Sequence, residues 1–247
     1  MDNLKNKVAV ITGGNSGIGY ATAKQLKGQG ATVVITGRRK EAIEKAAQEL
    51  GVIAITADQS NVSDIESLVS KVEQDFGKVD ILFINAGIAG LGNIEQTSEE
   101  LYDSIMNVNL RGAYFTLSKF IPILKDGASV VFLSSNTASM PGPGSSVYSA
   151  SKTALNSVMR SAALELAPRK IRVNSVSPGP TETEVMKKVG LDEATVNGIM
   201  DVVVEKVPLK QMGESEDVAK MVSYLSSEAA KFITGADFIM DGGMVLA

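Results

Sequence analysis

The sequence predicts an α/β fold with a doubly wound parallel sheet of about seven strands and helices on both of its faces. Short apolar runs rich in β-branched residues alternate along the chain with amphipathic helical stretches. The apolar runs are nearly continuous, as expected for strands that are buried on both faces. No repeat, linker or shift in composition divides the 247 residues, so we expect one domain over residues 1–247.

Turn and capping residues separate the elements of the first half of the chain. We expect strands at 7–12, 31–36 and 52–57, with helices at 20–29 and 40–50 between them. Gly30 and Gly51 directly follow these helices, where a left-handed conformation commonly ends a helix. Ser63-Asp64-Ile65-Glu66 reads as a capping box, which predicts a helix from there to about residue 76.

The second half continues the alternation. We expect strands at 79–84, 129–133, 171–176 and 237–240. Thr97-Ser98-Glu99-Glu100 reads as a second capping box and predicts helical sequence towards residue 124. A loop rich in Gly, Pro and Ser at 134–146 precedes a helix that contains Tyr148 and should end before Pro168.

Composition excludes several classes of function. A net charge of −4 with scattered Lys and Arg gives no reason to expect a nucleic-acid partner. The chain has no Cys and no His, so disulfides, thiol catalysis and the usual zinc sites are excluded, and we expect no metal. The polar residues 1–7 do not resemble a signal peptide, and no apolar run approaches the length of a bilayer. We therefore expect a cytoplasmic protein with no membrane partner.

A glycine-rich loop follows the first expected strand, with four glycines in the seven residues from Gly13 to Gly19. Glycine here lets the backbone approach a pyrophosphate, and the start of the next helix offers free N–H groups. An ordinary strand-to-helix turn often carries one glycine, so four of them indicate a nucleotide site. The spacing Gly13-x-x-x-Gly17-x-Gly19 differs from the Gly-x-Gly-x-x-Gly dinucleotide fingerprint.

The residues after the second expected strand indicate which nucleotide binds. A carboxylate there would bind the 2′-hydroxyl of NAD, but the sequence reads Thr36-Gly37-Arg38-Arg39. A guanidinium binds phosphate through two parallel hydrogen bonds. We therefore expect NADP(H) in preference to NAD(H), with Arg38 as the main ligand of the 2′-phosphate and Arg39 as the second. The alternative, a solvated basic start of the next helix, would suit Arg39 better than Arg38.

Tyr148 and Lys152 are the centre of the expected catalytic chemistry. Residues four apart share a helix face, so the phenol and the ammonium point into one site. A nearby positive charge favours the ionised phenol, and bringing its pKa from about 10 to neutrality takes about 4 kcal/mol. A Tyr followed by a Lys four residues later also arises by chance in a chain of this composition, so the pair indicates a catalytic site only together with the accompanying motifs.

Those motifs together resemble the short-chain dehydrogenases/reductases, in particular their compact single-domain branch. The matching residues are Thr12-Gly13-x-x-x-Gly17-x-Gly19, Asn85-Ala86-Gly87, Asn109, Ser135, Tyr148-x-x-x-Lys152 and Pro178-Gly179. The resemblance runs from about residue 7 to the C-terminus. It implies a Rossmann-type fold, hydride transfer between a nicotinamide and a carbonyl or secondary alcohol, and a homotetramer with residues 235–247 near subunit contacts. Those residues could equally be just the last strand.

The resemblance implies a role for each matching residue. Tyr148 would be the general acid and base, Ser135 would orient the substrate, and Lys152 would lower the Tyr148 pKa and hold the nicotinamide ribose. Asn109 would hold a water for proton relay in a locally opened helix, although a lone Asn in the middle of a helix usually just lies on its polar face. The distance of thirteen residues to Tyr148 selects Ser135 over its neighbour Ser134. Asp58 would bind the adenine amino group, unless it is a turn residue.

The full set of expected cofactor-binding residues is Gly13, Asn15, Ser16, Gly17, Ile18, Gly19, Arg38, Arg39, Asp58, Asn85, Ala86, Gly87, Tyr148, Lys152, Pro178, Gly179, Thr181 and Thr183. Residues 184–212, with Gly190 and Gly198, suit a mobile substrate lid. Met140, Met186 and Met200 would line an apolar pocket or serve as ordinary core residues.

Three other functions remain to be compared with a carbonyl reductase or alcohol dehydrogenase. A 3-oxoacyl-[acyl-carrier-protein] reductase would need a basic docking patch, for which only Arg169, Lys170 and Arg172 are candidates. A non-catalytic NADP-binding sensor would share the fold, because fold does not fix function, but here all four catalytic positions are filled. A nucleotide-sugar epimerase or dehydratase usually has a longer chain and another glycine spacing.

Overall fold

A single sheet connects the first and last strands of the chain in the computed structural model, which describes residues 4–182 and 193–247. Its strands are β1 (Val8–Thr12), β2 (Thr32–Gly37), β3 (Ile53–Thr56), β4 (Val79–Ile84), β5 (Leu124–Leu133), β6 (Arg172–Pro178) and β9 (Asp237–Met240). The order is β3-β2-β1-β4-β5-β6-β9, and every neighbouring pair is parallel. The predicted doubly wound parallel sheet is confirmed.

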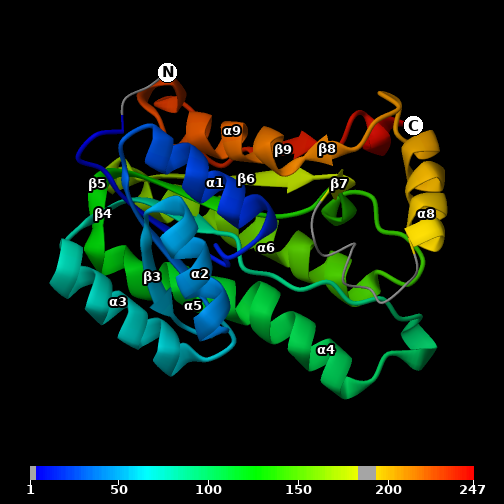
Figure 1. Cartoon of the computed structure of the whole chain (residues 1–247), viewed down its shortest axis with the longest axis horizontal. Coiled ribbons are helices and arrows are strands. Elements are labelled where there is room, and N and C mark those ends of the chain that lie inside the picture. The colour runs from blue at the N-terminus through cyan, green and yellow to red at the C-terminus, as the bar shows by residue number, and fades with distance from the viewer. Residues whose placement is uncertain (1–3, 183–192) are drawn as a thin grey trace.

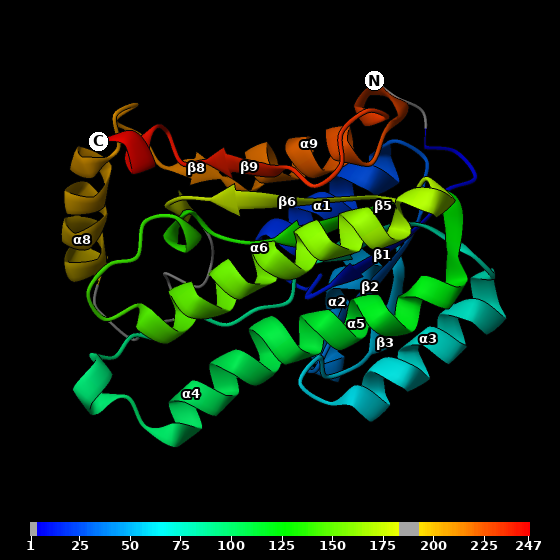
Figure 2. The ribbon, with the colours of Figure 1, turned by 180° about the vertical axis from the view of Figure 1, so that it is seen from behind.

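Helices cover both faces of this sheet, as Figures 1 and 2 show from opposite sides. One face carries α1 (Gly17–Gly28), α2 (Lys40–Leu50) and α9 (Ser215–Leu225). The other carries α3 (Val62–Phe76), α4 (Glu99–Met106), α5 (Ala113–Phe120) and α6 (Ser146–Leu166). Helix α8 (Glu193–Lys206) lies beyond the ends of the strands, beside the C-terminus (Figure 2).

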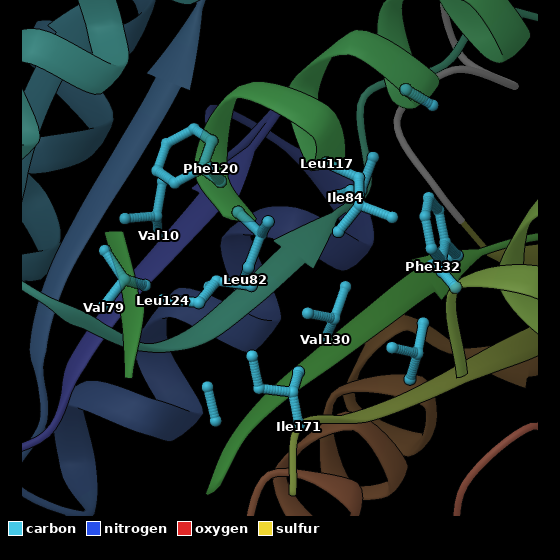
Figure 3. Close-up of a cluster of buried hydrophobic side chains, with 14 of the residues drawn as sticks. Val10, Val79, Leu82, Ile84, Leu117, Phe120, Leu124, Val130, Phe132 and Ile171 are labelled. Carbon is cyan, nitrogen blue, oxygen red and sulfur yellow. The ribbon is translucent and has the colours of Figure 1, made fainter. Parts of the chain in front are cut away.

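Each face of the sheet has its own apolar core, because successive side chains of a strand point to opposite faces. In β1, Ala9 and Ile11 pack with α1, α2 and α9, whereas Val10 packs with α3, α5 and α6. Figure 3 shows the second core, where Phe120 of α5 and Phe132 of β5 are fully buried. The packing in the two cores fixes the position of the helices along the strands, and with it the position of the loops at the carboxyl edge of the sheet.

The two predicted capping boxes are wrong in detail. Helix α3 begins at Val62, and its cap is Asn61, whose side-chain oxygen accepts a hydrogen bond from the Ser63 backbone N–H at 3.0 Å. Helix α4 is capped by Ser98, which accepts from the Leu101 N–H at 3.2 Å. Asn and Ser are both strong cap residues, so a box pattern alone did not single out the right one. A capping box does start α9, where Glu214 is the cap residue.

The predicted helical sequence towards residue 124 is confirmed, but the predicted strand from residue 129 is corrected. The helical part includes a π-helix at residues 107–112 between α4 and α5 and ends in a 3₁₀ helix at Ile121–Ile123. Strand β5 already begins at Leu124, where it pairs with Val79 of β4. A small second sheet of β7 (Thr181–Glu182) and β8 (Gly213–Glu214) was not foreseen, because two-residue strands leave no periodicity to detect.

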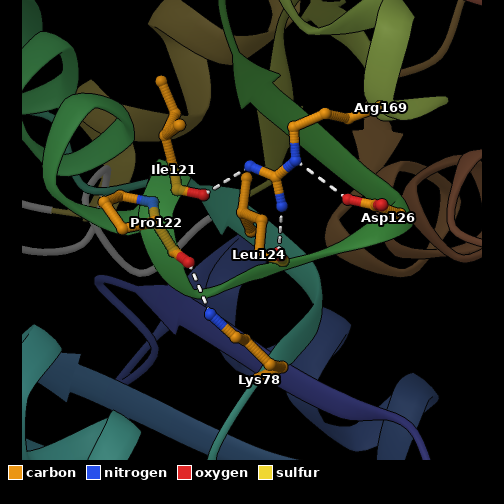
Figure 4. Close-up of polar contacts among 6 residues, drawn as sticks. All are labelled: Lys78, Ile121, Pro122, Leu124, Asp126 and Arg169. Carbon is orange, nitrogen blue, oxygen red and sulfur yellow. Dashed lines mark hydrogen bonds and ion pairs between the residues drawn. The ribbon is translucent and has the colours of Figure 1, made fainter.

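The amino edge of the main sheet is held by ion pairs and by hydrogen bonds to backbone carbonyls. Asp80 is buried and binds both Lys7 at 3.2 Å and Lys125 at 2.7 Å. Arg169 donates to the carbonyls of Ile121 at 2.8 Å and Leu124, and pairs with Asp126 at 2.9 Å (Figure 4). These contacts fix the turn before β5, at the edge opposite to the site described below.

None of the helices within residues 4–182 and 193–247 has both the length and the apolar composition needed to cross a membrane.

Candidate active site

The order of the strands reverses between β1 and β4, and the chain leaves the two strands in opposite directions along the sheet. In doubly wound sheets such a point opens a crevice at the carboxyl edge. Asn85, directly after β4, joins its two sides. Its side-chain amide donates to the carbonyls of Thr12 at 2.8 Å and Gly13 at 3.0 Å, and the Thr12 hydroxyl accepts from the Asn85 backbone N–H.

The glycine-rich loop between β1 and α1 has no room for side chains at two of its positions. Gly13 has φ +67°, and a Cβ there would lie 2.9 Å from the Ala86 Cα. A Cβ at Gly19 would overlap the Gly13 carbonyl oxygen and the Asn85 amide. The N-cap residue of α1, Ser16, makes no side-chain cap hydrogen bond. The first N–H groups of α1 are therefore left for a ligand, with the positive end of the helix dipole behind them.

A cavity of about 460 Å³ extends from this loop along the ends of β2, β3 and β4. It is lined by Gly13, Asn15, Ser16, Gly17, Ile18, Thr36, Gly37, Arg38, Arg39, Ala57, Asp58, Gln59, Asn85, Ala86, Gly87, Ile88, Val108 and Leu133. Of the residues predicted to bind the adenosine and pyrophosphate part of a dinucleotide, the structure places all but the packing residue Gly19 on this one surface. The cradle, the helix start and the two arginines fit such a group.

Arg38 and Arg39 are exposed at the end of β2, on the rim of this cavity. Neither guanidinium has an ion-pair or hydrogen-bond partner among the described residues. Arg39 is the N-cap residue of α2, without a side-chain cap bond. Two unneutralised guanidiniums at this place favour an additional phosphate over a bare ribose hydroxyl.

Asp58 is a turn residue that also lies on the cavity wall. Its Oδ1 accepts from the Ser60 backbone N–H at 2.9 Å and from the Ser60 hydroxyl at 2.8 Å, as in an Asx turn. The residue also lines the cavity and is only half-buried. Its turn therefore occupies one carboxylate oxygen and holds the side chain at the cavity wall.

Gln59 is a site residue that sequence reasoning missed. Its amide nitrogen donates to the carbonyls of Ala86 at 3.0 Å and Val108 at 3.1 Å, so it joins the segment after β4 to the π-helix. Its amide oxygen is buried without a partner among the described residues, and the residue is part of the cavity lining. A glutamine just after a strand carries no local signal, because its two partners are far away in the sequence.

Tyr148 and Lys152 lie in the first two turns of α6, with the Lys152 Nζ 5.7 Å from the centre of the Tyr148 ring. Lys152 is 3% exposed, and its Nζ donates to the Leu133 carbonyl at 2.7 Å. Leu133 also lines the cavity, and a Cβ on Gly87 would lie 3.4 Å from the same Nζ. The ammonium therefore stands where the cavity meets the phenol.

Burial changes the pKa of both groups. It lowers the pKa of Lys152 from 10.5 to about 8, so the amine remains mostly protonated at neutral pH. It raises the pKa of Tyr148, and a hydrogen bond with the Ser135 side chain acts in the opposite direction. The expected lowering of the Tyr148 pKa by Lys152 is therefore not seen in the chain alone, where the phenol stays neutral at physiological pH.

The two serines after β5 point in different directions. The Ser134 hydroxyl is buried and donates to the Lys152 carbonyl at 3.4 Å, inside the packing of α6. The Ser135 side chain instead interacts with Tyr148 and accepts hydrogen bonds from Thr137. Ser135, rather than Ser134, is therefore the serine that interacts with the phenol.

Asn109 lies in the π-helix of residues 107–112 and is 1% exposed. Its amide accepts from the Ile88 N–H at 2.8 Å and donates to the Ile88 carbonyl at 2.9 Å. The amide nitrogen also reaches the Ser151 hydroxyl at 3.2 Å, which in turn donates to the Tyr148 carbonyl at 2.6 Å. The locally opened helix is observed, and Asn109 connects it to the segment after β4 and to α6.

The segment after β6 turns sharply beside the C-terminus. Gly179 donates its N–H to the Met240 carbonyl at 3.0 Å, and a Cβ there would lie 2.5 Å from that of Asp241. Thr181 lies in β7, and its hydroxyl donates to the Gly179 carbonyl at 3.0 Å. Pro178, Gly179 and Thr181 lie at the carboxyl edge as predicted but outside the cavity lining. Thr183 lies outside the described residues.

The predicted lid at 184–212 is described only from residue 193. Its later part contains α8, β8 begins directly after it, and Met200 and Met140 are both half-buried. Met186 and Gly190 lie outside the described residues. A second cavity, of about 580 Å³, lies between α9, β9 and the segment before β8. It shares only Pro180 with the segment after β6 and contains none of the predicted catalytic residues.

Comparison with known proteins agrees with this geometry. A family model described as Enoyl-(Acyl carrier protein) reductase matches residues 13–245. The chain is 37% identical to an NADP-dependent (R)-specific alcohol dehydrogenase of Lentilactobacillus kefiri, over 98% of each protein. It is 34% identical to human dehydrogenase/reductase SDR family member 4, over 98% of this chain and 88% of that protein. A short-chain dehydrogenase/reductase from Serratia marcescens superimposes with a TM-score of 0.90 at 32% identity, covering 98% of this chain and 99% of that one.

Proposed function

The chain belongs to the short-chain dehydrogenase/reductase family, and from that premise we propose that it is an NADP(H)-dependent carbonyl reductase or secondary-alcohol dehydrogenase that uses Tyr148 as its general acid and base. Membership makes it an oxidoreductase that acts on CH–OH or C=O groups of small molecules with a nicotinamide cofactor. The preference for NADP(H) and the catalytic assignments are our proposal. We also infer that residues 1–247 form one domain, since β9 completes the sheet that β1 begins.

One observation carries the proposal most directly. The Lys152 ammonium binds the backbone carbonyl of Leu133, a residue of the cavity lining, so the Tyr148–Lys152 pair adjoins the cavity although neither residue belongs to the lining itself. A ligand that fills the cavity from the Arg38 rim inward would therefore end beside a neutral phenol. In a water-excluded site such a phenol is suited to hand over a proton.

The cofactor supplies the hydride, and the residues of the chain handle the proton and the position of the substrate. In carbonyl reduction, Tyr148 donates its proton to the substrate oxygen as negative charge develops there. The Ser135 hydroxyl donates a hydrogen bond to the same oxygen. Lys152 stabilises the tyrosinate that remains and holds the nicotinamide ribose, and Asn109 supports the path by which the proton is replaced. For alcohol oxidation the same groups act in reverse, with the tyrosinate as base.

Replacing Tyr148 tests the proposal. Tyr148→Phe removes only the hydroxyl, and we expect kcat/KM for reduction of a panel of ketones and β-ketoacyl thioesters to fall by about a hundredfold to ten-thousandfold. NADPH binding, measured by fluorescence, should change little. The matched control is Tyr114→Phe on α5, a tyrosine that is 51% exposed, which should leave both unchanged. A Tyr148→Phe variant as active as the parent would overturn the mechanism.

Arg38 tests the choice of cofactor. Arg38→Ala removes the guanidinium at the cavity rim, and we expect the Kd for NADPH to rise about tenfold or more, whereas that for NADH stays close to the parent value. Titration of both nucleotides into the two proteins measures this difference. An equal loss of affinity for both would contradict the assignment of the 2′-phosphate to Arg38.

The 3-oxoacyl-[acyl-carrier-protein] reductase alternative is weakened because two of the three basic residues that it would need for docking are engaged in other contacts. Arg169 is held by Asp126 and two carbonyls, and Arg172 donates to the Ser227 carbonyl at 3.2 Å. Of the three candidates, only Lys170 is exposed and makes no such side-chain contact among the described residues. Activity on a carrier-bound thioester far above that on the free thioester would favour this alternative. Cofactor binding without turnover of any member of the panel would favour the sensor.

A homotetramer with residues 235–247 near its subunit contacts remains our prediction. Strand β9 is the last strand of the sheet, and Ile239 within it is 39% exposed. Sedimentation of the purified protein measures the assembly directly, and a monomer would contradict the prediction.

A further inference from the structure

Thr137 makes two hydrogen bonds to one atom of the proposed site. Its backbone N–H donates to the Ser135 Oγ at 3.2 Å, and its hydroxyl donates to the same Oγ at 3.0 Å. Ser135 is the N-cap residue of the short helix Asn136–Ala138 that contains Thr137, so the two residues are held in one turn. Ser135 is 7% exposed, which leaves little access for water to compete.

These two bonds use all the accepting capacity of the Ser135 hydroxyl. A hydroxyl oxygen accepts two hydrogen bonds and donates one. With both acceptor positions occupied by Thr137, the remaining function of the group is to donate its own proton. The side chain with which it interacts is Tyr148 of α6, the helix to which the Thr153 hydroxyl ties the same turn at 3.0 Å.

We propose that Thr137 is a positioning residue that fixes the Ser135 hydroxyl as a hydrogen-bond donor toward the Tyr148 oxygen and the substrate oxygen. This inference rests on the proposed function, in which those two oxygens exchange the proton. It adds a residue for which neither the motifs nor the comparisons indicate a role. With its one proton, Ser135 then donates to whichever of the two oxygens carries the charge, tyrosinate or developing alkoxide, and does not compete for the proton that passes between them.

The consequence concerns the ionisation of Tyr148. A donor stabilises the phenolate, and the interaction with Ser135 does lower the pKa of Tyr148 against the effect of burial. Without the Thr137 hydroxyl, Ser135 gains a free lone pair and is able to accept from the neutral phenol, which raises that pKa. Among the described residues, the charged group beside the phenol is Lys152 of the same helix, whose Nζ lies 5.7 Å from the ring centre. The turn that contains Thr137 has no ionisable side chain.

Thr137→Val tests the inference, because it removes the hydroxyl while keeping the branched shape and the backbone N–H. Oxidation of a secondary-alcohol probe, 1-phenylethanol with NADP⁺, requires ionised Tyr148, so the acidic limb of kcat/KM against pH reports its pKa. We expect this limb to move up by about half to one pH unit, with a loss of about three- to tenfold in kcat/KM below it. Thr137→Ser restores the donor and should restore the midpoint of the parent.

A matched control separates positioning from loosening of the turn. The Thr153 hydroxyl donates to the carbonyls of Ala138 at 3.0 Å and Ser149 at 2.9 Å, so it ties the same turn to α6 without contacting Ser135. Thr153→Val should leave the midpoint of the limb at the parent value. A shift as large as that of Thr137→Val would overturn the inference.

A second readout needs neither cofactor nor turnover. With fluorotyrosine incorporated, which titrates at lower pH than tyrosine, fluorine NMR of the cofactor-free protein follows the phenol at 148, assigned by its absence in Tyr148→Phe. Thr137→Val should move this titration upward in the same direction as the kinetic limb. An unchanged midpoint in both measurements would overturn the inference.

The failure of the inference and that of the proposed function are distinguishable in one set of assays. If Tyr148→Phe and Ser135→Ala lose activity while Thr137→Val keeps the parent pH profile, only the role of Thr137 is wrong. If Tyr148→Phe and Ser135→Ala are as active as the parent, the proposed mechanism is wrong, and the role of Thr137 is wrong with it.

Discussion

The two edges of the same parallel sheet treat charge in opposite ways. At the amino edge, Asp80 binds two lysines, and Arg169 is satisfied by a carboxylate and two carbonyls. At the carboxyl edge, Lys152 is buried with a carbonyl as its hydrogen-bond partner, and Arg38 stands exposed on the cavity rim. The amino edge thus neutralises its charges within the protein, whereas the carboxyl edge keeps cations available for a ligand.

The backbone differs between the edges in the same sense. Where β1 leads into α1, the chain approaches itself so closely that Gly19 has no space for a Cβ. At Gly28, at the far end of α1, no atom would lie within 4 Å of a Cβ. The close approach brings the N–H groups of the helix start to the cavity. The comparison teaches that one helix serves binding at its first turn and only packing at its last.

Alanine at each of these two glycines should produce the largest difference between the edges. Gly19→Ala forces the glycine-rich loop to shift, and we expect NADPH affinity to fall by about a hundredfold or more. This factor corresponds to a loss of about 2.7 kcal/mol in binding free energy. Gly28→Ala should leave affinity unchanged and stabilise the protein by about 0.5–1 kcal/mol. Calorimetric titration and urea unfolding measure the two effects. Equal affinities in the two variants would remove the distinction that we draw within α1.

Lys152→Met should separate stability from function at the carboxyl edge. The lowering of the Lys152 pKa from 10.5 to about 8 corresponds to about 3 kcal/mol of destabilisation by the buried charge. The lost bond to the Leu133 carbonyl offsets about 1 kcal/mol of the gain. We therefore expect the variant to be inactive but more stable than the parent at pH 7, by about 2 kcal/mol.

This advantage should depend on pH in a defined direction. Between about pH 8 and 10.5 the unfolded parent binds a proton that the folded parent has lost, so the stability of the parent rises with pH through that window. Lys152→Met lacks the group, so its advantage should shrink over the same window and be constant below it. Urea unfolding at several pH values measures the difference, and a gap that widens above pH 8 would contradict the account.

Asp80→Asn should give the opposite result at the amino edge. The amide still accepts from the Val8 N–H but loses both ion pairs, in which the lysines are 45% and 42% exposed. We expect a loss of about 1–2 kcal/mol in the free energy of unfolding, with cofactor affinity unchanged. Asp126→Asn, at a carboxylate that is 74% exposed, should cost less than about 0.5 kcal/mol. A drop in NADPH affinity for Asp80→Asn would show that the two edges are coupled.

Most of the sheet was predictable from sequence, because strand periodicity and the glycine stops are local signals. The last strand, Asp237–Met240, was predicted to the residue, and Gly51 does adopt the left-handed conformation after α2. Strand β5 was predicted five residues too late at its start, since residues 125–128 are polar or small, and Leu124 joins the sheet by pairing with Val79 of β4. The caps were misplaced by one or two residues, because Asn61 competes with Ser63 and Ser98 competes with Thr97 for the same role.

The sequence by itself determined the type of fold, the glycine cradle and the spacing that puts Tyr148 and Lys152 on one helix face, because each depends on residues near one another in the chain. Only the tertiary structure decided that Gln59 joins two distant segments and that burial raises the pKa of Tyr148. Hydrogen-bond partners and burial depend on which elements pack together, and residues as far apart in the sequence as Gln29 and Ser223 are in contact in this fold.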